Sequence, residues 1–338
     1  MANKKIRVLI VDDSPLVREA LKVILGSDPD LEVVGLARDG REGVQKTLSL
    51  KPDVITMDIK MPLMNGLEAI EKIMEESPTP IIAVSSLDSK LVASALSVGA
   101  MDFVAIQDNI EELAADLLEK VKIASRVRPM RRFKVSKRAP IIPEKKVIKK
   151  EAERVISIGV STGGPQALQI LFSKMPSDIK AGVLVVQHIA SGFIGGLVEW
   201  LISNSSLDIK IAKHGDVIKS GTVLFAPDSF HMTVSEEGKI LLSEDTRGNS
   251  LFVPSIDVMM KSVADVYKDR AVGIIMTGMG HDGVEGIRAI KEAGGITIAQ
   301  DGESSAIFGM NKLAIEAGII NRIASLEKMV DEIIAVIG

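Results

Sequence analysis

The chain has 338 residues, of which 46% are hydrophobic, 25% are charged and only 3% are aromatic, and its formal net charge is −4. This length predicts two domains with cores of ordinary size. The absence of cysteine excludes disulfides and thiolate metal sites, so we expect a protein of the reducing cytoplasm. No apolar run reaches the roughly 18–20 residues of a membrane span, so we expect no membrane insertion.

Charge is distributed unevenly along the chain. Residues 1–125 hold 14 basic and 21 acidic residues, residues 126–150 hold 11 and 1, and residues 151–338 hold 16 and 23. The basic, proline-containing segment between two acidic halves is typical of an extended linker, which we place at residues 125–153. Its charge also suggests nucleic-acid binding. However, no helix-turn-helix pattern follows it and Phe133 is its one aromatic residue, so we expect no nucleic-acid partner.

Residues 1–124 alternate short apolar runs with amphipathic stretches. We expect strands at IRVLIV, EVVGLA, DVITM, PIIAVS and DFVAI, and helices near residues 15–25, 41–50, 66–76, 89–98 and 109–123. Five such units predict an α/β domain with a five-stranded, doubly wound parallel sheet.

Acidic residues follow two of these strands. Asp12 and Asp13 end the first strand and Asp58 ends the third, while Ser85 ends the fourth. The carboxyl ends of parallel strands meet at one edge of the sheet, where three carboxylates would repel one another unless a cation lay between them. Mg²⁺ suits such oxygen ligands. The alternative is that each acid is only a turn or helix-cap residue.

Residues 154–338 predict a second α/β domain. The runs VISIGV, GVLVVQ, AVGIIMT and ITIAQ are almost wholly apolar, as expected for buried parallel strands. Between the second and third of them, IKIAKH, TVLFAP and HMTVSEEGKILLSE alternate, and the EEG turn predicts an antiparallel hairpin. We therefore expect a mostly parallel sheet with one hairpin.

Three of the apolar strands end near reactive side chains, namely Ser161, His188 and Asp282. A serine needs a base to become a nucleophile, and an acid must orient that base, so this set indicates acyl transfer. Glycine-rich turns beside Ser161 and Asp282 would expose backbone N–H groups to an oxyanion. The sequence GVSTG also matches the nucleophile elbow of α/β-hydrolases, but that fold needs a histidine after the acid and none follows Asp282.

The sequence GMGHDG leaves a dinucleotide site open as an alternative. It is a glycine-rich turn between a strand and a helix, and Asp301 ends the next strand, where a ribose-binding acid would lie. This alternative gives Ser161 and His188 no role. Among the other histidines, His214 and His231 lie in the alternating region, where a histidine is more often a surface or strand residue than a base.

The sequences VDDSP, MDIKMP, VSS and GAMDFV resemble response-regulator receiver domains across residues 5–123. The resemblance implies that Asp58 is phosphorylated, with a chemotaxis histidine kinase as phosphodonor. It also implies Mg²⁺ held by Asp12, Asp13 and Asp58, and switch residues at Ser85 and Phe103.

Two adjacent residues depart from the receiver pattern. Ile106 and Gln107 stand where the family has Lys-Pro. An apolar side chain cannot pair with a phosphoryl oxygen, so we expect Asp58 to be phosphorylated with weakened or altered activation.

The second half resembles the chemotaxis protein-glutamate methylesterase family across residues 153–338, through GVSTGGPQAL, VVQHIASGF, FAPDSFHM, PSIDVMMKSVA, IMTGMGHDGVEGI and IAQDGESSAIFGM. The resemblance implies hydrolysis of glutamate methyl esters on the cytoplasmic helices of methylated chemoreceptors, with glutamine deamidation in some members and no cofactor for the ester chemistry. It assigns the nucleophile to Ser161, the base to His188, the orienting acid to Asp282, and the oxyanion donors to the backbone N–H groups of Met279 and Thr162.

Three departures surround this site without removing the triad. The segment 189–191 replaces Met-Pro-Pro, His281 replaces an asparagine, and Asn311 replaces a proline. They bear on substrate choice and rate, and they leave open the alternative of a catalytically weak adaptor or scaffold.

Overall fold

The computed structural model describes residues 4–85, 89–106, 110–127, 150–245 and 252–338. The chain divides into two compact units between residues 136 and 137, inside the basic segment, and that part of the segment lies outside the described residues. The last helix of the first unit ends at Ala124, and the first strand of the second begins at Arg154. The predicted linker lies between these two elements, but its end packs on the second unit: Ala152 is buried in the core, and its N–H donates to the carbonyl of Ile218 at 3.0 Å.

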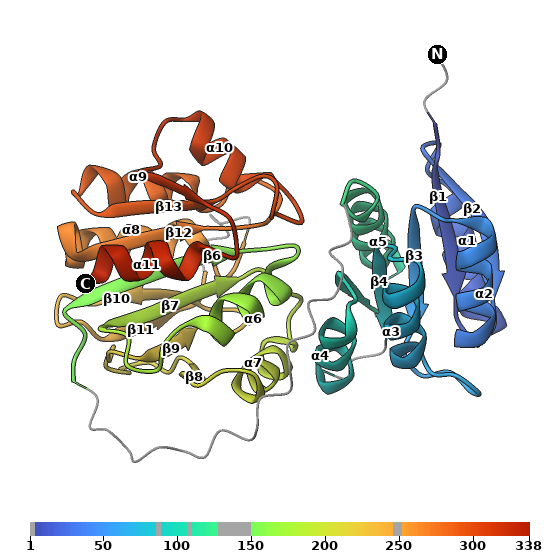
Figure 1. Ribbon diagram of the computed structural model, residues 1–338, viewed down its shortest axis with the longest axis horizontal. Coiled ribbons are helices and arrows are strands. Elements are labelled where there is room, and N and C mark those ends of the chain that lie inside the picture. The colour runs from blue at the N-terminus through green and yellow to red at the C-terminus, as the bar shows by residue number, and fades with distance from the viewer. Residues whose placement is uncertain (1–3, 86–88, 107–109, 128–149, 246–251) are drawn as a thin grey trace. The chain divides into compact units, whose positions relative to one another are not determined.

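The first unit is the predicted five-stranded parallel sheet (Figure 1). Its strands pair in the order β2-β1-β3-β4-β5 and all pairs are parallel. The elements are β1 (Ile6–Val11), α1 (Pro15–Gly26), β2 (Leu31–Ala37), α2 (Gly40–Leu50), β3 (Val54–Asp58), α3 (Gly66–Glu76), β4 (Ile81–Ser85), α4 (Ser89–Val98), β5 (Asp102–Ala105) and α5 (Ile110–Ala124). Each predicted helix is confirmed to within one residue at its ends.

Local sequence signals start these helices. Ser14 caps α1 by accepting a hydrogen bond from the N–H of Val17, and Asn65 and Glu68 form a capping box at α3. The strand order reverses between β1 and β3, and ligands of such sheets bind beside the carboxyl ends of the strands at this reversal.

The second unit contains a seven-stranded parallel sheet in the order β14-β13-β12-β6-β7-β9-β8. Its strands are β6 (Arg154–Val160), β7 (Ala181–Gln187), β8 (Asp208–Ile211), β9 (Thr222–Phe225), β12 (Ala271–Ile275), β13 (Ile296–Gln300) and β14 (Arg322–Ala324). The predicted hairpin is confirmed as antiparallel β10 (His231–Val234) and β11 (Ile240–Ser243). The alternating run at β8 pairs in parallel with β9, and its alternation reflects its place at the sheet edge.

Helices cover both faces of this sheet (Figure 1). One face packs against α6 (Gly164–Lys174), α7 (Ile194–Ser203) and α11 (Met329–Ile337), and the other against α8 (Ile256–Tyr267), α9 (Val284–Glu292), α10 (Met310–Glu316) and the hairpin. In β6, Ile156 and Ile158 face the first group while Val155 faces the second. Burial on both faces explains why the strands are apolar at nearly every position.

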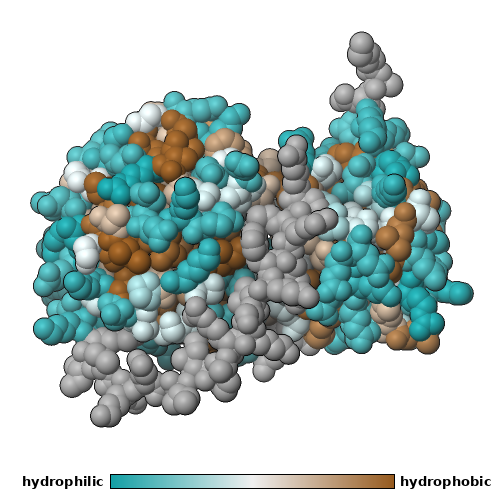
Figure 2. Space-filling model, viewed as in Figure 1, coloured by the Kyte–Doolittle hydropathy of each residue, from teal (hydrophilic) through white to brown (hydrophobic). Residues whose placement is uncertain are grey.

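The visible surfaces of both units are largely hydrophilic (Figure 2). Exposed apolar side chains interrupt them locally, among them Ile323 of β14 and Ile334 of α11. Within the described parts of the chain, no helix has the length and apolarity needed to span a membrane.

Helix α8 packs directly on β6 at Gly159. A Cβ atom at this position would lie 2.4 Å from Cγ2 of Ile256, so the helix would have to shift. We expect Gly159→Ala to lower the free energy of unfolding of the second unit by about 1–3 kcal/mol.

In α7, a Cβ at Gly195 meets no atom within 4 Å. Gly195→Ala should therefore raise the free energy of unfolding of the second unit by about 0.5–1 kcal/mol. Urea unfolding followed by circular dichroism measures both, and wild-type stability of Gly159→Ala would contradict this packing.

Candidate active site

Adjacent strands bring Ser161 and His188 to one edge of the second sheet. Val160 of β6 is in register with Gln187 of β7, so Ser161 and His188 follow at neighbouring positions. The N–H of His188 donates to the carbonyl of Val160 at 3.0 Å, and the N–H of Ser161 donates to the carbonyl of Thr277, after β12, at 3.0 Å. Ser161 therefore lies between the loops that follow β7 and β12.

Two glycines allow the close approach of backbone around Ser161. Gly163 caps α6 with a backbone φ of +77°, which residues other than glycine rarely adopt. A Cβ at Gly278 would lie 2.7 Å from the Cβ of Ser161. A larger residue at Gly278 would therefore displace the serine or the loop after β12.

Gln187 ties the serine loop to the histidine loop. Its side chain is 3% exposed, and its Nε2 donates to the carbonyls of Ser161 at 2.9 Å and of His188 at 2.8 Å. Gln187 is not among the predicted site residues. The available signal was a lone polar side chain at the end of a wholly apolar strand.

Asp282 lies at the N-terminus of α8, where it accepts four hydrogen bonds. Its Oδ2 accepts from Nε2 of His188 at 2.9 Å and from the N–H of Ile256 at 2.7 Å. Its Oδ1 accepts from Oγ of Ser255 at 2.8 Å and from the N–H of Asp257 at 3.0 Å. The unpaired N–H groups and the dipole of a helix N-terminus both favour a negative charge.

These donors keep Asp282 ionised. Burial alone would raise its pKa, but the hydrogen bonds from His188 and from the N–H groups of Asp257 and Ile256 outweigh burial, and the pKa lies below its usual range. A carboxylate at neutral pH can hold the proton-bearing nitrogen of an imidazole and stabilise the imidazolium.

The ring of His188 is fixed on two sides. Nε2 faces Asp282, and the ring stacks on Phe252 with centroids 4.4 Å apart and an interplanar angle of 9°. Within the described parts of the chain, the buried Nδ1 has no hydrogen-bond partner. Since the carboxylate accepts the proton on Nε2, Nδ1 carries the lone pair and is the nitrogen able to act as a base.

The N–H groups of Thr162 and Met279 are available at the same edge. Thr277 Oγ1 donates to the carbonyl of Thr162 at 2.9 Å and accepts from the N–H of Ile307 at 2.9 Å, which holds the two loops together. Among the residues that the structure describes, neither the N–H of Thr162 nor that of Met279 donates to an acceptor. Both can therefore donate to a developing oxyanion.

The family departures differ in what they contact. Ile189 packs against the core, and His281 is exposed. Asn311 is fully buried, and its Nδ2 donates to the carbonyl of Gln300 and to Oγ of Ser305, both at 2.8 Å. Asn311 thus fixes the loop between β13 and α10.

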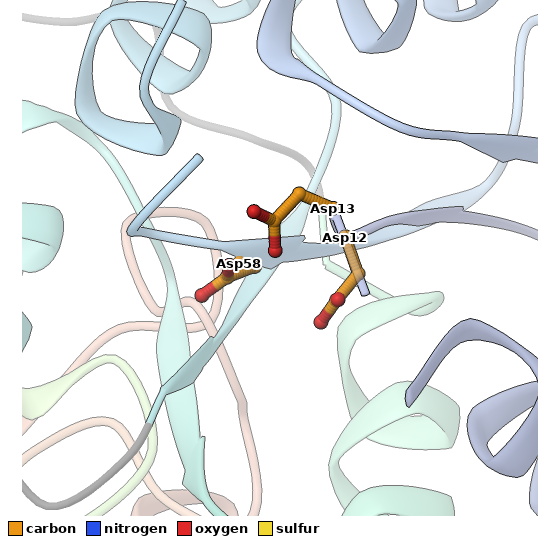
Figure 3. Close-up of side chains that lie close together, drawn as sticks. All are labelled: Asp12, Asp13 and Asp58. Carbon is orange, nitrogen blue, oxygen red and sulfur yellow. The ribbon is translucent and has the colours of Figure 1, made fainter. Parts of the chain in front are cut away.

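In the first unit, Asp12, Asp13 and Asp58 converge beside β1 and β3 (Figure 3). One oxygen from each lies within 4.8 Å of the others. Burial, with added repulsion from Asp58 and Asp13, raises the pKa of Asp12 to about 6, and burial also raises the pKa of Asp58. Three repelling carboxylates with few compensating donors fit a hard divalent cation such as Mg²⁺.

The implied switch residues lie on the two strands that follow β3 across the sheet, Ser85 on β4 and Phe103 on β5. Ser85 is buried at the end of β4, and its carbonyl accepts the N–H of Ile106 at 2.9 Å. Phe103 is 1% exposed, and the ammonium of Lys120 lies 5.2 Å from its ring centroid. Gln107 lies outside the described residues.

A family model described as CheB methylesterase matches residues 156–333, and one described as response regulator receiver domain matches residues 8–117. The chain belongs to the CheB methylesterase family. A protein of Pyrococcus horikoshii named protein-glutamate methylesterase/protein-glutamine glutaminase is 41% identical, with 99% of this chain and 94% of that protein covered. One of the same name from Thermotoga maritima is 38% identical with both chains covered completely.

The crystal structure of the Thermotoga maritima CheB methylesterase catalytic domain is also similar. It matches with a TM-score of 0.52 and 34% identity, over 54% of this chain and 98% of that one. The sequence resemblance, the α/β fold class and the assignment to a family of hydrolases are thereby confirmed.

The Asp282 carboxylate should stabilise the second unit in a pH-dependent way. Its pKa is lower in the folded than in the unfolded chain, so its contribution is complete above the unfolded value of about 4 and is lost as the pH falls through the folded value. We expect Asp282→Asn to lower the free energy of unfolding by about 1–3 kcal/mol at pH 7, because an amide nitrogen would face N–H donors. The difference in free energy of unfolding between wild type and Asp282→Asn should shrink near pH 3.

Urea unfolding at pH 7 and at about pH 3 measures both quantities. Glu285→Gln, at an exposed position in the first turn of α9, controls for the loss of one negative charge. A difference between wild type and Asp282→Asn that stays the same at both pH values would count against the folded-state shift.

Proposed function

We propose that this chain is a phosphorylation-regulated protein-glutamate methylesterase of chemotaxis. Its substrates would be γ-glutamyl methyl esters on the cytoplasmic helices of chemoreceptors, which places it in the cytoplasm, with glutamine deamidation as a second reaction of the same site. The carrying observation is the ordered His188–Asp282 pair in the loop beside Ser161, because the imidazole Nδ1 has no hydrogen-bond partner among the residues that the structure describes. The names of the relatives support the substrate.

In the proposed reaction, Ser161 Oγ attacks the ester carbonyl while Nδ1 of His188 takes its proton. The tetrahedral intermediate collapses, the C–O bond to methanol breaks, and the imidazolium gives its proton to the leaving methoxide oxygen. Water then attacks the acyl-serine, with His188 as base, and releases the glutamate carboxylate and free serine.

The surrounding groups stabilise the charges that develop. Asp282 holds Nε2 of the imidazolium through the 2.9 Å hydrogen bond. The N–H groups of Met279 and Thr162 would donate to the oxyanion, an interaction that exists only in the transition state and intermediate. No cofactor is needed for these steps.

Regulation would begin at Asp58 of the first unit. Transfer of a phosphoryl group from a chemotaxis histidine kinase to Asp58 adds negative charge beside Asp12 and Asp13. Mg²⁺ held by these three carboxylates would offset that charge. The proximity of the three carboxylates supports this ligand set.

The dinucleotide alternative is less well supported. It requires Asp301 to reach a ribose, but the Asp301 carboxylate accepts hydrogen bonds from the N–H of Ser304 at 2.9 Å and from its Oγ at 2.7 Å. Asp282, inside the glycine-rich motif, is directed to the N-terminus of α8 instead.

Removal of the nucleophile tests the proposed reaction. We expect Ser161→Ala to reduce methanol release from methylated receptor membranes by at least about 10³-fold, because the nucleophile is lost while the binding groups remain. Ser173→Ala in α6, whose hydroxyl donates to the carbonyl of Ile170 in the same helix, is the matched control. Activity retained in Ser161→Ala would exclude the proposed mechanism, whereas receptor binding without hydrolysis by the wild type would favour the adaptor alternative.

Restoring a cation at position 106 tests the regulation. Ile106→Lys would place an ammonium group after β5, beside the end of β4. A charge-assisted hydrogen bond contributes about 1.5–3 kcal/mol, so a small acyl phosphate with Mg²⁺ should stimulate Ile106→Lys about tenfold more than wild type. Methanol release with and without the phosphodonor measures this. Asp58→Asn should remove the stimulation from both proteins, and equal stimulation of both would contradict a role for Ile106.

A further inference from the structure

A second histidine is connected to the triad acid through one residue. His231 of β10 is 7% exposed, and its Nδ1 accepts the backbone N–H of Ser255 at 3.2 Å. Ser255 in turn donates its hydroxyl to Oδ1 of Asp282 at 2.8 Å. On the other side of the ring, Nε2 of His231 lies 4.0 Å from Oδ2 of Asp245, whose side chain is 12% exposed.

The hydrogen bond fixes the tautomer of the His231 ring. A backbone N–H can only donate, so Nδ1 must carry a lone pair and the ring proton lies on Nε2, toward Asp245. A proton on Nδ1 would face the N–H of Ser255 and break this contact. The charged groups concerned are Asp245, which pairs with the ring, and Asp282, which is reached through Ser255.

Ser255 controls three of the four donors to Asp282. It caps α8, its hydroxyl binds Asp282, and the next two N–H groups, those of Ile256 and Asp257, also donate to that carboxylate. Fixing the Ser255 backbone therefore fixes the direction of the Asp282 carboxylate and of the His188 ring that it holds.

The geometry points to His231 as a positioning residue for the triad, which acts by accepting the N–H of Ser255 and so aiming Asp282 at His188. This inference rests on the proposed function. Burial alone would allow an apolar residue at this position, since His231 is only 7% exposed. An apolar side chain there would leave the buried N–H of Ser255 without an acceptor.

Three variants of the full chain separate acceptor geometry from packing. His231→Asn keeps an acceptor oxygen near the Nδ1 position, His231→Gln moves it toward the Nε2 position, and His231→Leu removes it. His214 offers a matched control, since its Nδ1 also accepts a backbone N–H, from Leu242 at 3.2 Å, at an exposed position. His214→Leu therefore repeats the same chemical change away from Asp282.

For methanol release from methylated receptor membranes, we expect His231→Leu and His231→Gln to lower kcat about tenfold with KM unchanged. His231→Asn should recover most of this loss, and His214→Leu should resemble wild type. Equal kcat values for wild type and His231→Leu would overturn the inference, as would an equal loss in Asn and Gln variants. If His231→Leu does not fold, the comparison of Asn with Gln decides alone.

Amide hydrogen exchange at residues 255–257, measured by mass spectrometry, provides a readout that does not depend on the substrate. Exchange should be faster in His231→Gln than in wild type and should return toward wild type in His231→Asn; identical exchange in all three would contradict the inference. If the wild type released no methanol, the proposed function would fail, whereas an active wild type with unaffected variants would reject only the role of His231.

Discussion

The hydrogen bonds between the Asp282 carboxylate and the N-terminus of α8 determine the geometry of the second unit's site. The exchange is reciprocal, because Asp257 in the first turn of α8 accepts the N–H groups of Gly283 and Gly286 at the start of α9. Asp282, just before α9, thus supplies a carboxylate to the N-terminus of α8, and Asp257 of α8 supplies one to the N-terminus of α9. Burial and the neighbouring Asp282 raise the pKa of Asp257, and the helix N–H groups make two close carboxylates tolerable. The imidazole of His188 completes this arrangement.

Burial acts on the carboxylates of Asp12 and Asp282 alike, but their pKa values shift in opposite directions. Asp12 is buried with few donors and two like charges, so its pKa rises to about 6 and the cluster favours a cation. Asp282 is also buried, but its donors lower its pKa. Asp12, with one backbone donor and two neighbouring carboxylates, fits a cation, whereas Asp282, with several donors, stays ionised and can orient an imidazole.

The sequence predicted what local patterns encode. Apolar runs with reactive residues at their ends placed Ser161, His188 and the acidic cluster at strand ends, and caps such as Asn65 marked the helices. Gln187 and the donors to Asp282 from the start of α8 were missed because their contacts join distant segments: the bond from Gln187 to Ser161 spans 26 residues and that from Ser255 to Asp282 spans 27. The alternating pattern identified the strand that holds His231, but no sequence periodicity predicts that the N–H of Ser255 contacts its ring. The parallel pairing of β8 with β9 was not predicted either, because no local pattern encodes which strand lies beside an edge strand.

In the receiver unit, position 106 lacks the cation that the family has, whereas Lys120 places a cation over Phe103. Lys120 is buried; burial would lower its pKa, but Asp102 and Asp116 raise it, so the ammonium that lies over Phe103 and donates to its carbonyl stays charged. This cation favours the inward position of the aromatic ring. A tenfold change in a two-state equilibrium requires about 1.4 kcal/mol of difference between the states. A lysine at position 106 could supply this difference through one charge-assisted bond to a phosphoryl group, and an isoleucine cannot. Under the proposed regulation, the coupling would then fall to Ser85, with the Phe103 ring already buried.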